Sequence, residues 1–150
     1  MSPSFEERIE VSPADLPATL TGFEDPPSET MAAGIEAFNA GRFFEAHEYF
    51  EETWIPEEGP LAHFYQGLVM IAAGFHHLTS RVELPGVKRL LGTGIEQVEP
   101  FAPACQGLDV ARLVAETAAA RELALELGQA RLATFPGDRI PTIHMAGEST

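Results

Sequence analysis

The sequence has almost no cysteine, and this scarcity limits both its covalent architecture and its expected compartment. Cys105 is the single cysteine in 150 residues, so an internal disulfide is excluded. A lone thiol is typical of a reducing compartment. The N-terminal segment "MSPSFEERIEV" also lacks the positive region and apolar stretch of a secretory signal. We therefore expect a cytoplasmic protein.

Basic residues and long apolar runs are scarce as well. Nine Lys and Arg face 23 Asp and Glu, which gives a formal net charge of −14. This charge repels phosphate backbones and anionic membrane surfaces, so we expect no nucleic-acid partner. The most apolar segment, residues 67–75, is far shorter than the roughly 20 residues that cross a bilayer. We expect a buried helix there and no membrane partner.

What the sequence does have is helical periodicity, bounded by residues that start and stop helices. Ser28 and Asp109 are good N-cap residues, Pro60 suits a first helical turn, and Gly41 follows the end of a periodic segment. No strand pattern competes with the helical one. Helices joined by short loops pack as neighbours, so the prediction is an all-α compact bundle. The predicted helices cover residues 28–39, 42–54, 60–80, 85–101 and 109–127 or beyond.

The two ends of the chain are rich in residues that break helices. Prolines punctuate the first 27 residues, and the segment "FPGDRIPTIHMAGEST" closes the chain. We expect an extended proline-rich arm over residues 1–27, the helical bundle over residues 28–135, and a flexible tail with few internal hydrogen bonds over residues 136–150. We also expect His144 in the tail to be solvated, and His63, beside a loop, to be exposed.

The stretch "FEAHEYFEETW" at residues 44–54 gathers charged and aromatic side chains on one predicted helix. A helical wheel places its core stripe on Phe43, Ala46, Phe50 and Trp54. His47 and Glu51 fall at the edge of this stripe, half in the core. Glu45 and Glu52 lie farthest from it and are expected to face water.

The string from His47 to Glu51 reads H-E-x-x-E, one letter from the zinc-protease string H-E-x-x-H. Two ligands at i and i+4 project from one helix face, and a neighbouring glutamate can polarise a bound water. If the predicted helix over residues 60–80 packs against the one over residues 42–54, Gln66 or His77 can reach His47, Glu48 or Glu51. One hypothesis is therefore a metal-assisted hydrolase, with a divalent metal on His47, Glu51 and His77, Glu48 as general base, and a lining of Glu45, Gln66 and Trp54.

Two other hypotheses fit the same residues. The cluster can be a small-molecule pocket that orients a ligand without transforming it. It can also be a buried hydrogen-bond network that fixes helix register in a structural or interaction domain, because buried polar groups must be satisfied. The acidic face and the apolar residues of the arm are compatible with a homo-oligomer.

The strings "FNAGRFFEAHEYFEETW", "FYQGLVMIAAGFHH" and "GVKRLL" together resemble the DUF309 family of small helical proteins, a family of unknown function. The resemblance covers roughly residues 30–113, including "GLDVARL". It implies an all-helical fold, in agreement with the periodicity. Met70 stands where the family often has a second glutamine, and "SRVELPG" replaces its usual Gly-Asn turn. The resemblance implies these characteristic positions without assigning them roles: Glu45, His47, Glu48, Trp54, Glu51, Gln66 and His77.

Overall fold

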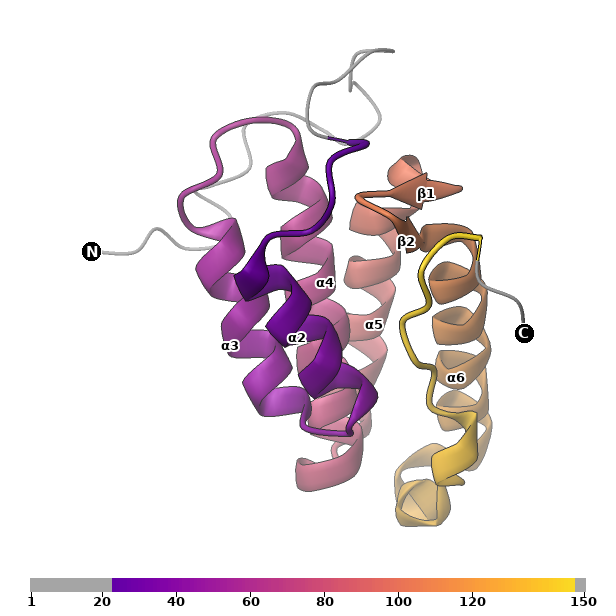
Figure 1. Cartoon of the computed structure of the whole chain (residues 1–150). Helices are drawn as coiled ribbons and strands as arrows, with labels where there is room; N and C mark the ends of the chain where they lie inside the picture. The colour runs from indigo at the N-terminus through magenta and orange to yellow at the C-terminus, as the bar shows by residue number, and fades with distance from the viewer. Residues whose placement is uncertain (1–22, 148–150) are drawn as a thin grey trace.

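The structure is a computed structural model that describes residues 23–147, and this part of the chain is all-α, as predicted. Its helices run beside one another with short connections (Figure 1). Residues 1–22, most of the predicted N-terminal arm, lie outside the described residues. The helices are α2 Glu29–Asn39, α3 Phe43–Trp54, α4 Leu61–His76, α5 Leu84–Val98 and α6 Val110–Arg131.

Shorter elements connect the helices. Strands β1 (Ala104–Cys105) and β2 (Leu108–Asp109) pair in antiparallel register. The sequence gives no sign of them, because two-residue strands are too short to show a periodicity. The remaining short elements are a π-helical turn over His77–Arg81 and 3₁₀ turns over Glu99–Phe101, Leu132–Thr134 and Gly137–Arg139.

The helix starts follow the predicted capping chemistry. Ser28 Oγ accepts a hydrogen bond from Met31 N at 3.1 Å, and Asp109 Oδ1 accepts one from Arg112 N at 3.0 Å. Each satisfies a backbone donor that the first helical turn leaves unpaired. Gly41 has φ +80°, a value that glycine adopts readily, and it turns the chain between α2 and α3.

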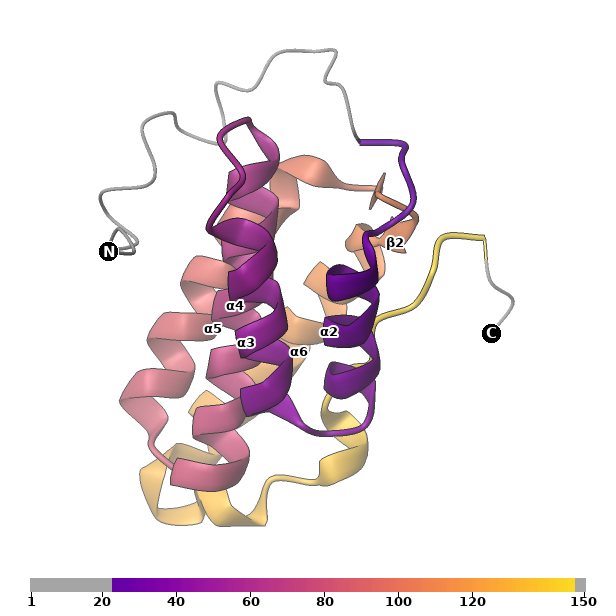
Figure 2. The ribbon, with the colours of Figure 1, turned by 60° about the vertical axis from the view of Figure 1, so that its left-hand side comes forward.

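The predicted helix over residues 60–80 changes its winding near its end. It is α-helical to His76, winds as a π-turn over the next five residues, and stops at Val82 in the left-handed region, with φ 52° and ψ 53°. That conformation is uncommon for a β-branched residue. Gln129 of α6 braces it, because its Nε2 donates to Val82 O and its Oε1 accepts from Leu84 N, both at 2.7 Å. Figure 2 shows the end of α6 beside this turn.

Helix α4 is the centre of the bundle and is buried along nearly its whole length, as its apolar composition predicted. It packs between α3 and α5. Nothing in residues 23–147 forms a helix long and apolar enough to cross a membrane.

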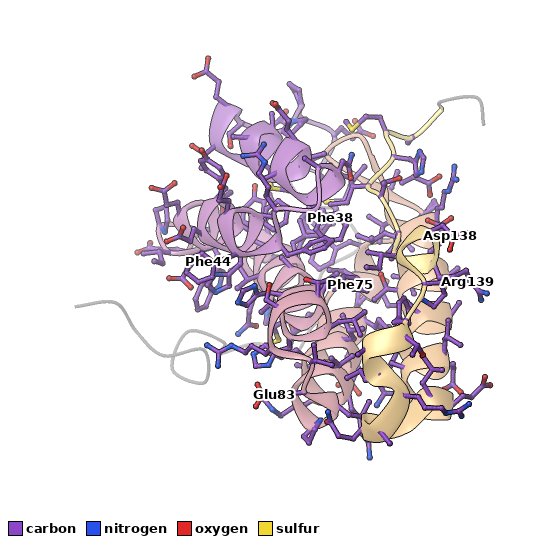
Figure 3. The ribbon with its side chains drawn as sticks, turned by 90° about the horizontal axis from the view of Figure 1, so that it is seen from below. Phe38, Phe44, Phe75, Glu83, Asp138 and Arg139 are labelled. Atoms are coloured by element: carbon purple, nitrogen blue, oxygen red, sulfur yellow. The ribbon has the colours of Figure 1, made fainter. Side chains whose placement is uncertain are left out.

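Three phenylalanines join α2, α3 and α4 at one end of the bundle. The ring centroids of Phe38 and Phe43 are 5.1 Å apart, those of Phe38 and Phe75 5.9 Å, and those of Phe43 and Phe75 5.7 Å. Phe38 meets both other rings edge to face, an arrangement that aromatic quadrupoles favour. Phe38 and Phe75 lie in the middle of the molecule in Figure 3. We call these three residues the phenylalanine cluster.

Helices α4 and α5 cross with their backbones in close approach. A Cβ added at Gly94 would lie 2.7 Å from Ile71 Cγ1 and 3.0 Å from the carbonyl oxygen of Gly67. A Cβ added at Gly67 would lie 3.1 Å from the carbonyl oxygen of Gly94. Gly94, which weakens the helix propensity of α5, therefore permits the close packing of the two helices together with Gly67 of α4.

The end of the chain makes more hydrogen bonds than we expected. The Asn39 side chain donates to Ile143 O at 2.9 Å and accepts from Ile143 N at 2.7 Å. Asp109 N donates to His144 O at 2.8 Å, and Ala146 N donates to Gly107 O at 2.6 Å. The expectation of few internal hydrogen bonds is therefore wrong for residues 143–146, because a polar side chain and strand edges far away in sequence meet this segment.

The expectation that His63 is exposed is also wrong. Its side chain is buried, with 4% of the residue accessible, and its Nδ1 lies 3.3 Å from Gln97 Oε1 on α5. Burial lowers the pKa of His63 below its ordinary value, and the hydrogen bond to Gln97 opposes this shift.

We predict that Gly94→Ala lowers the free energy of unfolding by about 1–3 kcal/mol, because the new methyl group meets backbone that cannot move aside. Urea denaturation followed by circular dichroism measures this change. Gly92→Ala is the matched control in the same helix, since its Cβ would meet the movable side chain of Arg121. Equal unfolding midpoints for the two variants would show that the close crossing is unimportant.

We predict that His63 makes the fold less stable in mild acid. Because its pKa is lower in the folded than in the unfolded protein, the unfolded chain takes up the proton first. Its contribution is fully present above the unfolded pKa of about 6.5 and is lost as the pH falls below that value. Urea midpoints at about pH 7.5 and 5.5 should differ less in His63→Gln than in the unaltered chain. An unchanged difference would contradict the prediction.

Candidate functional site

Helix α3 presents its side chains as the helical wheel predicts. Its core stripe of Phe43, Ala46, Phe50 and Trp54 is buried. The side chains of His47 and Glu51 are 25% and 39% accessible, at the border of that stripe. Glu45, Glu48 and Glu52 are exposed. The polar residues of α3 are thus in two groups, one at the core edge and one in water.

His47 and Glu51 form a pair within one helix. His47 Nε2 lies 3.4 Å from Glu51 Oε2, one helical turn further along. The other ring nitrogen, Nδ1, is buried and makes no hydrogen bond within residues 23–147. The pair therefore leaves one imidazole nitrogen unsatisfied.

Phe44 is the large apolar side chain of residues 23–147 that faces solvent, with 53% of the residue accessible. Its ring centroid lies 5.8 Å from that of His47 and 5.4 Å from that of His76 at the end of α4. Figure 3 shows Phe44 at the edge of the molecule, away from Phe38 and Phe75. We call Phe44, His47 and His76 the ring patch.

The ring patch lies directly outside the phenylalanine cluster. Phe43 and Phe75 meet in the core, and the next residue of each helix, Phe44 and His76, meet at the surface. The buried contact therefore fixes the position of the exposed one. Sequence reasoning did not single out Phe44 or His76. The available signal was the wheel itself, which sets Phe44 among the glutamates rather than in the core stripe.

His76 is neutral at physiological pH. Burial lowers its pKa, and the neighbouring Arg81, His77 and His47 lower it further because each disfavours a second positive charge. The ring patch is therefore formed by a phenyl ring and an uncharged imidazole on α4, together with the imidazole of His47.

His77 turns to a different partner. Its Nδ1 lies 3.3 Å from Glu83 Oε1, within ion-pair distance but without hydrogen-bond alignment. Its ring also packs against the start of α5, since a Cβ added at Gly86 would lie 2.5 Å from His77 Nδ1. Because consecutive residues of a helix point about 100° apart, His76 and His77 lie in different environments.

The residues predicted to hold a metal do not form one donor set. His47 pairs with Glu51, whereas His77 pairs with Glu83. Across residues 23–147, no three or more His, Cys, Asp or Glu side chains are grouped so that they could hold a metal ion. Glu48, the predicted general base, is exposed. The described structure therefore does not bring the three predicted ligands together.

The remaining predicted site residues are not members of the ring patch. Gln66 and Trp54 are core residues, with 1% and 2% of each accessible. Glu45 forms an ion pair with Arg42 at the start of α3. Glu45 is thus matched by a charge on its own helix.

Cys105 does not supply a nucleophile. It is buried, and burial raises the pKa of its thiol to about 12, so the thiol stays protonated. The nearby buried polar contact, in which Gln106 Nε2 donates to Tyr65 Oη at 2.9 Å, joins the β1–β2 connection to α4.

Comparison with known proteins agrees with the resemblance in the sequence. The family described as "Domain of unknown function (DUF309)" matches residues 31–90, from α2 into α5. No curated protein matches the chain. The matched span includes every residue of the ring patch and of the phenylalanine cluster. The resemblance is therefore confirmed over residues 31–90, the part of the chain that matches the DUF309 family.

Proposed function

We propose that this DUF309 domain is a non-catalytic recognition module that binds its ligand at the ring patch. The observation that carries the proposal is the exposure of Phe44, 53% accessible, in contact with two imidazoles from two helices. Burying a phenylalanine side chain stabilises a protein by about 1.5–3 kcal/mol relative to leaving it in water. Part of that free energy is available to a ligand that covers the ring.

A single exposed apolar residue is ordinary on a protein surface. Phe44 differs because His47 and His76 extend its ring into a continuous aromatic surface across the α3–α4 boundary. Aromatic residues are enriched at binding interfaces. The arrangement therefore supports recognition of a planar or apolar group.

The backbone beneath the ring patch is held rigidly. Phe43 packs at 5.7 Å from Phe75, so neither helix can move at this point without disturbing the core. Rigid presentation lowers the entropy lost on binding. This favours the ring patch over the loops as a recognition surface.

The hydrolase hypothesis has less support from the same residues. It needs His77 beside His47 and Glu51, whereas His77 contacts Glu83 and the start of α5. It also needs Glu48 over an enclosed reacting group, and Glu48 is exposed. A binding surface requires neither condition.

We predict that small neutral heteroaromatic fragments, screened by ¹⁵N NMR against the full chain, shift the backbone amides of residues 44–48 and 75–78. Phe44→Ala should abolish these shifts while changing the free energy of unfolding by less than about 1 kcal/mol, because the side chain is largely exposed. Phe44→Leu is the matched control that keeps an apolar side chain without a ring. It should bind more weakly than the unaltered chain.

Two results would contradict the proposal. Fragment shifts that persist in Phe44→Ala would place the binding surface elsewhere. Divalent-metal-dependent ester hydrolysis that is lost in Glu48→Gln would instead support the hydrolase hypothesis.

A further inference from the structure

The partner of the ring patch can be inferred from the carboxylates of α3 that lie beside Phe44. We infer that the ring patch receives an arginine or lysine side chain of a basic peptide segment, and that Glu48 and Glu52 bind further cationic groups of the same segment. This inference rests on the proposed recognition function and names the class of ligand.

The exposed side chains of α3 form a strip of suitable composition. Phe44, Glu48 and Glu52 follow one another at i, i+4 and i+8, and all are exposed. Side chains at this spacing are neighbours on a helix surface. The strip is about 12 Å long, since each helical residue rises 1.5 Å, and a segment of a few residues can cover it.

The carboxylates of α3 differ in whether a charge already matches them. Glu45 is paired with Arg42, and Glu51 with His47. Glu48 and Glu52 form no ion pair with any residue of 23–147. The two unmatched carboxylates are those that share the strip with Phe44, so a partner that covers the ring also meets negative charge.

The aromatic ring adds an attraction for the same kind of group. A guanidinium or ammonium over a phenyl face is attracted by the negative face of the ring, by about 0.5–2 kcal/mol. The methylene stem of arginine or lysine also packs against apolar surface while its head stays in water. Phe44 therefore suits the stem and head of a basic residue better than it suits an acidic or purely apolar one.

The net charge of the whole chain favours a basic peptide over nucleic acid and over a second copy of the chain. A net charge of −14 accelerates encounter with cationic segments and repels nucleic acids. It also repels a second copy of the chain, which carries the same charge. Charge complementarity thus commits the ring patch to a basic peptide.

The test uses the full chain and a helical, alanine-based peptide of about 18 residues that carries arginines at i, i+4 and i+8. Its affinity is measured by isothermal titration calorimetry at low salt. The companion peptide replaces each arginine with citrulline, which keeps the shape and removes the charge. We expect the arginine peptide to bind and the citrulline peptide to bind at least about tenfold more weakly.

The variants separate the ring patch from general attraction between acid and base. Phe44→Ala should weaken binding by roughly 5- to 30-fold, and the double variant Glu48→Gln/Glu52→Gln by roughly fivefold or more. The matched control is Glu122→Gln/Glu126→Gln, which removes the same charge at the same i, i+4 spacing from exposed positions on α6. Figure 1 shows α6 on the side of the bundle away from α3. This control should change the affinity by less than about twofold.

Several outcomes would overturn the inference. If both double variants lose the same affinity for the arginine peptide, the peptide is attracted to the overall charge of the protein rather than to the ring patch. Equal affinity for the arginine and citrulline peptides would show that the charge of the ligand is not recognised, which overturns the inference. The proposed recognition function would still stand if the neutral fragments bind at the ring patch. Sedimentation showing a dimer that Phe44→Ala dissociates would identify a second copy as the occupant. If neither the fragments nor the peptides shift the NMR signals of the ring patch, both proposals are refuted.

Discussion

The contact between Phe43 and Phe75 determines what the surface above it can present. These rings lie 5.7 Å apart, and Phe38 closes the cluster from α2. Because the residues that follow, Phe44 and His76, continue on helices held in this way, their meeting at the surface is a consequence of core packing. The relative position of the exposed rings is therefore set by the buried phenylalanines rather than by contacts of the exposed rings themselves. A change in the buried phenylalanines would therefore alter recognition without touching the binding surface.

Much of the helical bundle can be predicted from the chemistry of residues that are close together in the sequence. Ser28 and Asp109 cap the helices that they were expected to start, and the apolar stripe of α3 is buried as the wheel requires. These features depend on residues a few positions apart, so the sequence contains them directly. The same wheel separates the glutamates of α3 into border and solvent positions, which the structure confirms.

The features that the sequence does not reveal depend on partners far along the chain. His63 is buried against Gln97 of α5, and His77 lies beside Glu83 and the start of α5 rather than beside His47. Helical spacing gives the stripe on which His77 lies, because its N–H still bonds to Ala73 O, but it does not say which neighbouring element that stripe meets. The wheel therefore placed His47 and Glu51 correctly at the border of the core, but the prediction grouped them with His77, which contacts Glu83 and the start of α5.

The two hydrogen bonds between Asn39 and Ile143 have a consequence for how the protein is made. They join residues 104 positions apart, and Asn39 is the last residue of α2. Domains fold as units during synthesis, and contacts between distant residues form late. When α2 leaves the ribosome, the side-chain amide of Asn39 cannot make these two bonds until Ile143 has also emerged, 104 residues later. The bundle is therefore completed at its first described helix only after the segment around Ile143 has been translated.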